Sequence, residues 1–252
     1  MKRNIFFQGI GFMLLLVLVG ACKKEEDEPE FKPMSFDSEE VLAKLPSGLK
    51  SASDSYAEDC VEFIETAVDM SSFIDNMLPP EDAKLSVKNG SSQTWTWTWS
   101  YLGQSFSFIW TYEEDKSRRY WSMDIQFNDG PAKDYLNAWE SLDGSEGEVV
   151  YNFNWVLIGD DDLTDYEDLY WKYSWKQEKD GTYRYTWQYD SSDPDYTYYL
   201  QHNFVINPDG SGSIDYYSLD ELSYHMEWEA DGSGTWSYHL GGIHLSGSWT
   251  AG

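Results

Sequence analysis

Apolar and polar residues alternate along most of the chain from residue 93 onward. The alternation is clearest where threonines separate Trp95, Trp97 and Trp99, and a period of two places one side of a β-strand in a core and the other in solvent. Eleven series of this kind predict eleven strands, at residues 95–99, 106–112, 121–127, 151–157, 171–175, 183–189, 198–204, 214–216, 222–228, 236–240 and 243–249.

Short segments that contain glycine connect most of these strands. Those at residues 102–103, 179–181, 209–212, 231–234 and 241–242 supply the positive φ angles of tight hairpins, so we expect an up-and-down antiparallel meander. Asp-Gly-Ser-Gly occurs at residues 209–212 and 231–234, which we interpret as shared turn chemistry rather than a propeller or solenoid repeat. Two connections are longer: residues 128–147, where Pro131 is expected to open a helical segment, and the acidic loop 159–168.

A helix is predicted before the strands, over residues 55–78. Ser55 and Glu58 have the spacing of a capping box, and Pro79-Pro80 ends the segment. Its apolar positions recur every three or four residues, which indicates one buried stripe. Cys60 lies on this stripe, so we expect a buried thiol and not a nucleophile.

A meander of about eleven strands with a single apolar face must bury that face. We therefore expect a mainly β fold that forms a barrel or an open half-barrel and packs on the N-terminal amphipathic helix. In strand number and layout this resembles the unclosed barrels of lipoprotein-carrier and lipid-binding envelope proteins, although no motif is shared. The resemblance implies an architecture and transfers no activity.

The N-terminus has the pattern of a secretory signal: Lys2 and Arg3 precede an apolar run from residue 10 to 19, which is too short to span a bilayer. The run ends in Leu-Val-Gly-Ala-Cys at residues 18–22, which resembles the lipobox of bacterial lipoproteins. The resemblance implies that residues 1–21 are a signal peptide and that the Cys22 thiol carries the lipid that anchors the protein to the outer membrane.

A charged tract follows Cys22. Residues 23–28, Lys-Lys-Glu-Glu-Asp-Glu, resemble the export tract with which Bacteroidota-type lipoproteins reach the cell surface. The resemblance implies exposure at the surface, and a periplasm-facing site is the alternative. We expect residues 22–36 to form a flexible lipidated tether and residues 37–252 a single domain.

The net charge and the cysteine content bear on two further properties, the class of partner and the presence of a disulfide. The formal net charge is −28, which repels phosphate backbones and makes nucleic acid an improbable partner. With Cys22 acylated, Cys60 is the only other thiol, so no intramolecular disulfide is expected.

Aromatic residues make up 17% of the chain, and their rings could line a cleft for an extracellular glycan, lipid or other amphipathic ligand. The alternative is that these rings fill the core, because they lie on the inward period. The residues that we predict to bind such a ligand are Trp95, Trp97, Trp99, Trp110 and Trp187.

Turn lengths predict a second candidate site on the polar face. A two-residue loop at Gly241-Gly242 sets His239 opposite His244, and a three-residue loop at residues 231–233 sets His225 opposite His239. With a three-residue loop at residues 219–221, the resulting row is Asp215, His225, His239 and His244. Imidazoles on adjacent strands could meet around Zn²⁺ or Cu²⁺, and histidines on a solvated face are the inert alternative.

Other chemistry has weaker support. The acidic segments at residues 160–168 and 190–195 could hold Ca²⁺, but neither has the spacing of a calcium-binding loop, and solvated loops explain them as well. The sequence contains no nucleophile elbow, phosphate loop or dinucleotide fingerprint, so we expect no catalytic residues and no cofactor beyond these candidate metals.

The sequence therefore predicts a lipid-anchored cell-envelope protein, a non-enzymatic binding module for a glycan, lipid or other amphipathic ligand. A structural or assembly subunit of an outer-membrane complex is the first alternative. A metal-dependent hydrolase that uses the histidine row is the second.

Overall fold

A computed structural model of the chain describes residues 32–36, 38–71, 78–89, 92–101, 103–153, 169–191, 198–219 and 221–252. The predicted signal peptide, Cys22 and the export tract lie outside these residues, as does most of the acidic loop. The described chain contains three helices and thirteen strands.

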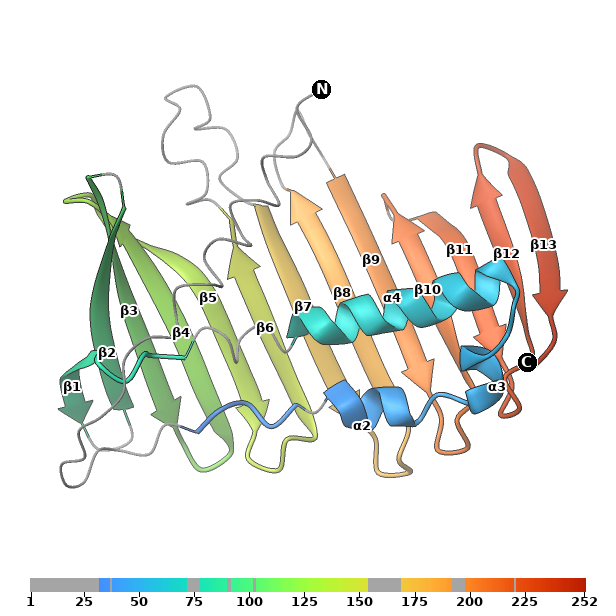
Figure 1. Cartoon of the computed structure of the whole chain (residues 1–252), viewed down its shortest axis with the longest axis horizontal. Coiled ribbons are helices and arrows are strands. Elements are labelled where there is room, and N and C mark those ends of the chain that lie inside the picture. Colours follow the sequence, from blue (N-terminus) through green and yellow to red (C-terminus); the bar gives the residue numbers. More distant parts are fainter. Residues whose placement is uncertain are drawn as a thin grey trace.

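The strands form one antiparallel sheet in which every strand pairs with its neighbours in sequence, from β1 to β13 (Figure 1). The bounds are β1 (Lys84–Asn89), β2 (Ser92–Tyr101), β3 (Gln104–Glu114), β4 (Arg118–Phe127), β5 (Ala132–Ser141), β6 (Glu146–Asn152), β7 (Leu169–Gln177), β8 (Tyr183–Ser191), β9 (Tyr198–Ile206), β10 (Gly212–Ser218), β11 (Glu221–Trp228), β12 (Gly234–Leu240) and β13 (Ile243–Trp249). The predicted antiparallel meander is confirmed. The edge strands β1 and β13 do not pair with each other, so the sheet is open and the closed barrel was wrong.

The two strands that alternation did not predict are β1 and β5. The expected helical segment after Pro131 was wrong, because residues 132–141 pair with β4 and β6. A β-bulge shifts the register between the Met123–Leu136 and Asp124–Asp134 pairs. The bulge leaves both Tyr135 and Leu136 buried in succession, which breaks the alternation and imitates helical spacing.

The helices are α2 (Ser38–Ala43), α3 (Ser47–Lys50) and α4 (Ser55–Ser71). Helix α4 begins one residue after its cap: the Asp54 carboxylate accepts a hydrogen bond from the Tyr56 amide at 2.9 Å, and the Asp54 carbonyl accepts from the Glu58 amide. The capping residue is therefore Asp54 and not Ser55. The helix crosses one face of the sheet in front of β7 to β12 (Figure 1), which we call the helix face. The opposite side is the outer face.

The core lies on the helix face. The Cys60, Ile64 and Val68 side chains of α4 are fully buried in one cluster with large rings of the sheet. Tyr185 of β8 donates a hydrogen bond from its hydroxyl to the Ala67 carbonyl at 2.7 Å. Burial, reinforced by the charge of Asp59, raises the pKa of the Cys60 thiol to about 12. The expectation of a buried thiol is thus confirmed.

Hairpins with the sequence Asp-Gly-Ser or Asp-Gly-Thr close one end of the sheet after β5, β7, β9 and β11. In the last of these, the Glu229 amide donates to the Ser233 carbonyl at 2.8 Å, so the loop consists of residues 230–232. Gly232 occupies its third position with φ +95°, a conformation that glycine adopts without strain. The amide and hydroxyl of Ser233 both donate to the Asp231 carboxylate, which lowers the pKa of Asp231.

Three of these turns are also held by tryptophan. In the turn after β5, the Trp175 indole donates to the Gly144 carbonyl at 3.2 Å, and the other two turns share the Asp-Gly-Ser-Gly sequence. The Trp228 indole donates to the Gly210 carbonyl at 2.8 Å, and the Trp249 indole donates to the Gly232 carbonyl at 2.7 Å. Each indole lies over the glycine that pairs with it across the strands, Gly212 or Gly234, where a Cβ atom would clash with the ring. The shared Asp-Gly-Ser-Gly sequence therefore serves a shared turn with an indole packed against it.

Candidate functional site

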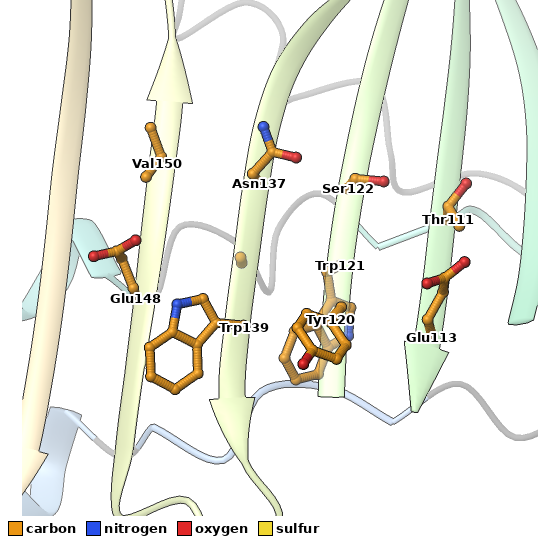
Figure 2. A pocket seen from close by; sticks show the side chains of 10 residues that line it. Thr111, Glu113, Tyr120, Trp121, Ser122, Asn137, Trp139, Glu148 and Val150 are labelled. Carbon is orange, nitrogen blue, oxygen red and sulfur yellow. The ribbon is translucent and has the colours of Figure 1, made fainter. Parts of the chain in front are cut away.

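A hollow of about 340 Å³ lies on the outer face over β3 to β6 (Figure 2). Its lining residues come from four neighbouring strands, and two of them, Trp121 and Ala138, have their side chains in the core on the helix face. The lining residues are Thr111, Glu113, Tyr120, Trp121, Ser122, Asn137, Ala138, Trp139, Glu148 and Val150.

Strand register arranges the hollow in two rows. The first row pairs Glu113 with Tyr120, Tyr120 with Trp139, and Trp139 with Glu148, so two aromatic rings lie between two carboxylates. The second row lies two residues further along the strands and consists of Thr111, Ser122, Asn137 and Val150. Directly opposed side chains in a sheet are about 5 Å apart, so the two rings are neighbours with hydroxyl and amide groups beside them.

The aromatic row is fixed by contacts at both rings. The guanidinium of Arg118 stacks on Trp139, with 3.7 Å between its carbon and the ring centroid, and it also lies 3.8 Å from Glu146. Tyr120 donates a hydrogen bond from its hydroxyl to the Asp115 carboxylate at 3.1 Å. Desolvation and this acceptor raise the pKa of Tyr120, so its hydroxyl stays protonated at neutral pH.

The polar groups of the hollow are also held in place. Glu113 accepts a hydrogen bond from the Ser92 hydroxyl at 3.0 Å, and Glu148 pairs with Lys172 at 2.8 Å. The Asn137 amide donates to both carboxylate oxygens of Asp134, at 2.8 and 2.7 Å, which leaves its carbonyl oxygen as an acceptor. The hollow thus offers aromatic surface together with oriented hydrogen-bonding groups.

The five tryptophans that we predicted to bind a ligand lie on the helix face, on the other side of the sheet from the hollow. Trp95 pairs with Trp110, Trp97 stacks on Phe108 with 5.2 Å between centroids, and Trp99 follows on the same strand. Trp110 is fully buried in the core, and Trp187 lies on β8 with its ring 4.8 Å from that of His202. Their role in ligand binding stays a prediction.

Sequence reasoning missed Tyr120 and Trp139. Tyr120 precedes the inward Trp121 and therefore falls on the polar phase of its strand, where an aromatic residue is unexpected. An aromatic residue at a polar position of the alternation could therefore have indicated Tyr120 from the sequence alone. Trp139 was assigned to the incorrect helical segment, so its place opposite Tyr120 could not be seen.

The predicted histidine row is divided in the structure. Asp215 pairs with His225, with 2.7 Å between a carboxylate oxygen and Nδ1, and His239 pairs with His244, with 4.3 Å between ring centroids, as predicted. His225 lies opposite Ser237, however, and not opposite His239. The row was wrong at this step because the loop begins at Ala230, one residue earlier than assumed.

No cluster of three or more histidine, cysteine or acidic side chains with metal-binding geometry occurs in the part of the chain that the structure describes. The candidate Ca²⁺ loop at residues 160–168 lies outside that part, as do Asp193 and Asp195. Asp190 accepts a hydrogen bond from the Tyr170 hydroxyl at 3.0 Å. Zinc, copper or calcium binding therefore stays a prediction.

None of the helices among the described residues is long and apolar enough to cross a membrane. Comparisons of the chain with protein-family models, with curated proteins and with solved structures find no match. The fold and the site together define a protein with an open antiparallel sheet, helices against one face and an aromatic hollow on the other.

Proposed function

We propose that this chain is a non-enzymatic lipoprotein of the bacterial outer membrane that binds a neutral glycan in the outer-face hollow. The observation that supports binding is the row Glu113, Tyr120, Trp139 and Glu148, with two aromatic rings flanked by carboxylates. Aromatic faces stack on the apolar faces of sugar rings, and carboxylates and amides accept hydrogen bonds from sugar hydroxyls.

The lining favours a glycan over a lipid. A lipid chain requires a continuous apolar groove, whereas Glu113, Asn137 and Glu148 place charged and amide groups beside the rings. The hollow is near the lower end of the roughly 300–1,000 Å³ that ligand sites usually occupy. It therefore suits a short stretch of a longer chain that lies along the surface.

Charge favours a neutral sugar over an acidic one. The protein carries a net charge of −28, and both ends of the aromatic row are carboxylates. Arg118 and Lys172 already pair with Glu146 and Glu148, so they do not offer free positive charge to a uronic acid or a phosphorylated sugar. An anionic ligand would be repelled by the Glu113 carboxylate and by the net negative charge of the protein.

The cellular location rests on the resemblance of residues 18–22 to a lipobox and of residues 23–28 to a surface export tract. Metabolic labelling with a fatty acid tests the anchor, and labelling should be lost in Cys22→Ser. Protease treatment of intact cells tests exposure, because only a surface protein is digested before the outer membrane is opened. A protected protein would leave the periplasm-facing alternative.

Binding is tested on immobilised glycans with protein purified as Cys22→Ser, which prevents lipidation. Retention on a neutral polysaccharide that is lost in Tyr120→Ala supports the proposal. The matched control is Tyr217→Ala, which removes the same side chain from the outer face of β10, away from the hollow. Equal retention of both variants would contradict the assignment of the site, and retention of none of the proteins on any glycan would contradict the function.

A further inference from the structure

The two edge strands of the sheet, β1 and β13, differ in how well they are protected from pairing with a strand of another molecule. Strand β1 begins with Lys84, and its pairing with β2 is interrupted by a bulge between Leu85 and Val87. Charged side chains and bulges are two common devices that prevent an edge from pairing with a second sheet. Strand β13, Ile243–Trp249, has neither device: its register with β12 is regular and its sequence contains no acidic or basic residue apart from one histidine.

On the side away from β12, the main chain of β13 faces no other strand among the described residues. Gly241 and Gly242 both have positive φ, at 55° and 84°, and form a two-residue turn between paired Leu240 and Ile243. In such a hairpin the flanking residues are a hydrogen-bonded pair, and the pattern then alternates along the strand. The N–H and C=O groups of His244, Ser246 and Ser248 therefore point away from β12.

Apolar side chains accompany this edge. Ile243 is 59% exposed and Leu245 is 52% exposed, although Leu245 lies on the helix face opposite Tyr238, which packs against the core. Exposed apolar residues beside an unprotected strand edge are typical of a surface that is covered by a partner.

Charge indicates which partner fits. Residues 234–252 form β12, β13 and the segment that follows, and they contain no Asp, Glu, Lys or Arg in a chain with 17 basic and 45 acidic residues. Two copies of a chain with net charge −28 repel each other over most of their surfaces. Their β13 strands can approach without opposing carboxylates, and a neutral strand offers nothing to select a charged partner segment.

We propose that two copies of this chain pair antiparallel through β13, so that their sheets become one continuous sheet across a two-fold axis. Full overlap of the seven-residue strand places Ser246 on the axis and sets Ile243 of each copy beside Trp249 of the other. The pairing uses the β13 edge of each copy, and Lys84 and the bulge of β1 oppose the addition of a further strand at the other edge. The assembly therefore ends at two copies instead of growing into a filament.

Sedimentation velocity over a concentration series, with the Cys22→Ser protein, tests the proposal. We expect a monomer–dimer equilibrium with no larger species. Ser246→Pro removes an outward N–H at an edge position that tolerates proline, and Leu245→Lys adds the kind of charge that protects β1. Each should weaken dimerisation by at least about tenfold, which corresponds to about 1.4 kcal/mol. Ser246→Ala keeps the N–H and should dimerise as the parent does.

Thermal melting shows whether each variant is folded. If Ser246→Pro does not fold, Leu245→Lys alone tests whether β13 forms the dimer. A protein that stays monomeric throughout the series would overturn the proposal, as would a dimer that survives both substitutions. Oxidative cross-linking gives an independent result: Ser246→Cys, on the axis, should form an intermolecular disulfide, whereas Ser237→Cys on β12 should not. Equal cross-linking of the two variants would refute the register.

Discussion

His202 gives the structure a measurable dependence on pH. Its ring lies on the helix face between Phe63 of α4, Trp187 of β8 and Tyr216 of β10, with centroid distances of 5.3, 4.8 and 4.6 Å. Burial among these rings lowers the pKa of His202 from its ordinary value of 6.5 to about 4. Because the pKa is lower in the folded protein, protonation favours unfolding, and the contribution of the neutral ring is complete above pH 6.5 and is lost as the pH falls from 6.5 to 4.

The magnitude follows from the two pKa values. Proton linkage between 6.5 and about 4 gives a loss of about 2 kcal/mol in the free energy of unfolding at pH 5 relative to pH 7. Many carboxylates also respond over this range, so the quantity to measure is the difference between the parent and His202→Phe, which keeps a ring and cannot be protonated. Urea unfolding should show that, between pH 7 and pH 5, the free energy of unfolding falls by about 2 kcal/mol less in His202→Phe than in the parent.

A matched substitution at an exposed histidine, His239→Phe, removes an imidazole without changing the aromatic cluster around His202, and it should follow the pH dependence of the parent. If the parent and His202→Phe lose the same stability between pH 7 and pH 5, the aromatic surroundings do not disfavour the imidazolium. The description of this cluster as a desolvating environment would then be refuted.

Two further predictions concern contacts between the N-terminal segment and the sheet. The fully buried Glu140 carboxylate accepts hydrogen bonds from Arg119 at 2.8 Å and from the amide and hydroxyl of Ser35 at 2.8 and 2.9 Å. Urea unfolding should show that Glu140→Ala costs about 3–5 kcal/mol, because Arg119 Nη1 and the Ser35 amide lose their buried acceptor and only Glu114 and the Leu142 carbonyl still contact the guanidinium. A cost below about 1 kcal/mol would contradict this role. A Cβ atom at Gly232 would lie 2.1 Å from the Leu49 amide nitrogen, so Gly232→Ala should lower stability by more than about 2 kcal/mol. Gly241→Ala is its control, since φ is also positive there but no atom lies within 4 Å, and equal losses would show that contact with Leu49 is unimportant.

The sequence predicted most strands because alternation directly reports a sheet with one buried face. It failed where local geometry interrupts that period: the bulge at Tyr135 and Leu136 looked helical, and β1 is too rich in lysine to look half-buried. Whether the sheet closes depends on strand twist and stagger, which alternation does not encode. The open edges therefore became visible only in the structure.

The candidate sites show how much depends on register. Two of the three predicted steps in the histidine row are correct, since Asp215 pairs with His225 and His239 with His244. The remaining step failed because Gly232, with positive φ, takes the third loop position and draws the loop one residue toward the N-terminus. The aromatic hollow was missed for a different reason: its two rings belong to strands that are adjacent only after β5 is recognised.

The claim that the outer-face hollow binds a neutral glycan is tested most directly by calorimetric titration with neutral oligosaccharides. The side-by-side rings of Tyr120 and Trp139 predict that Trp139→Ala weakens binding by about tenfold or more, or about 1.4 kcal/mol, while Tyr217→Ala binds as the parent does. Unchanged affinity in Trp139→Ala, with the fold intact by thermal melting, would show that any glycan binds elsewhere and would contradict the account.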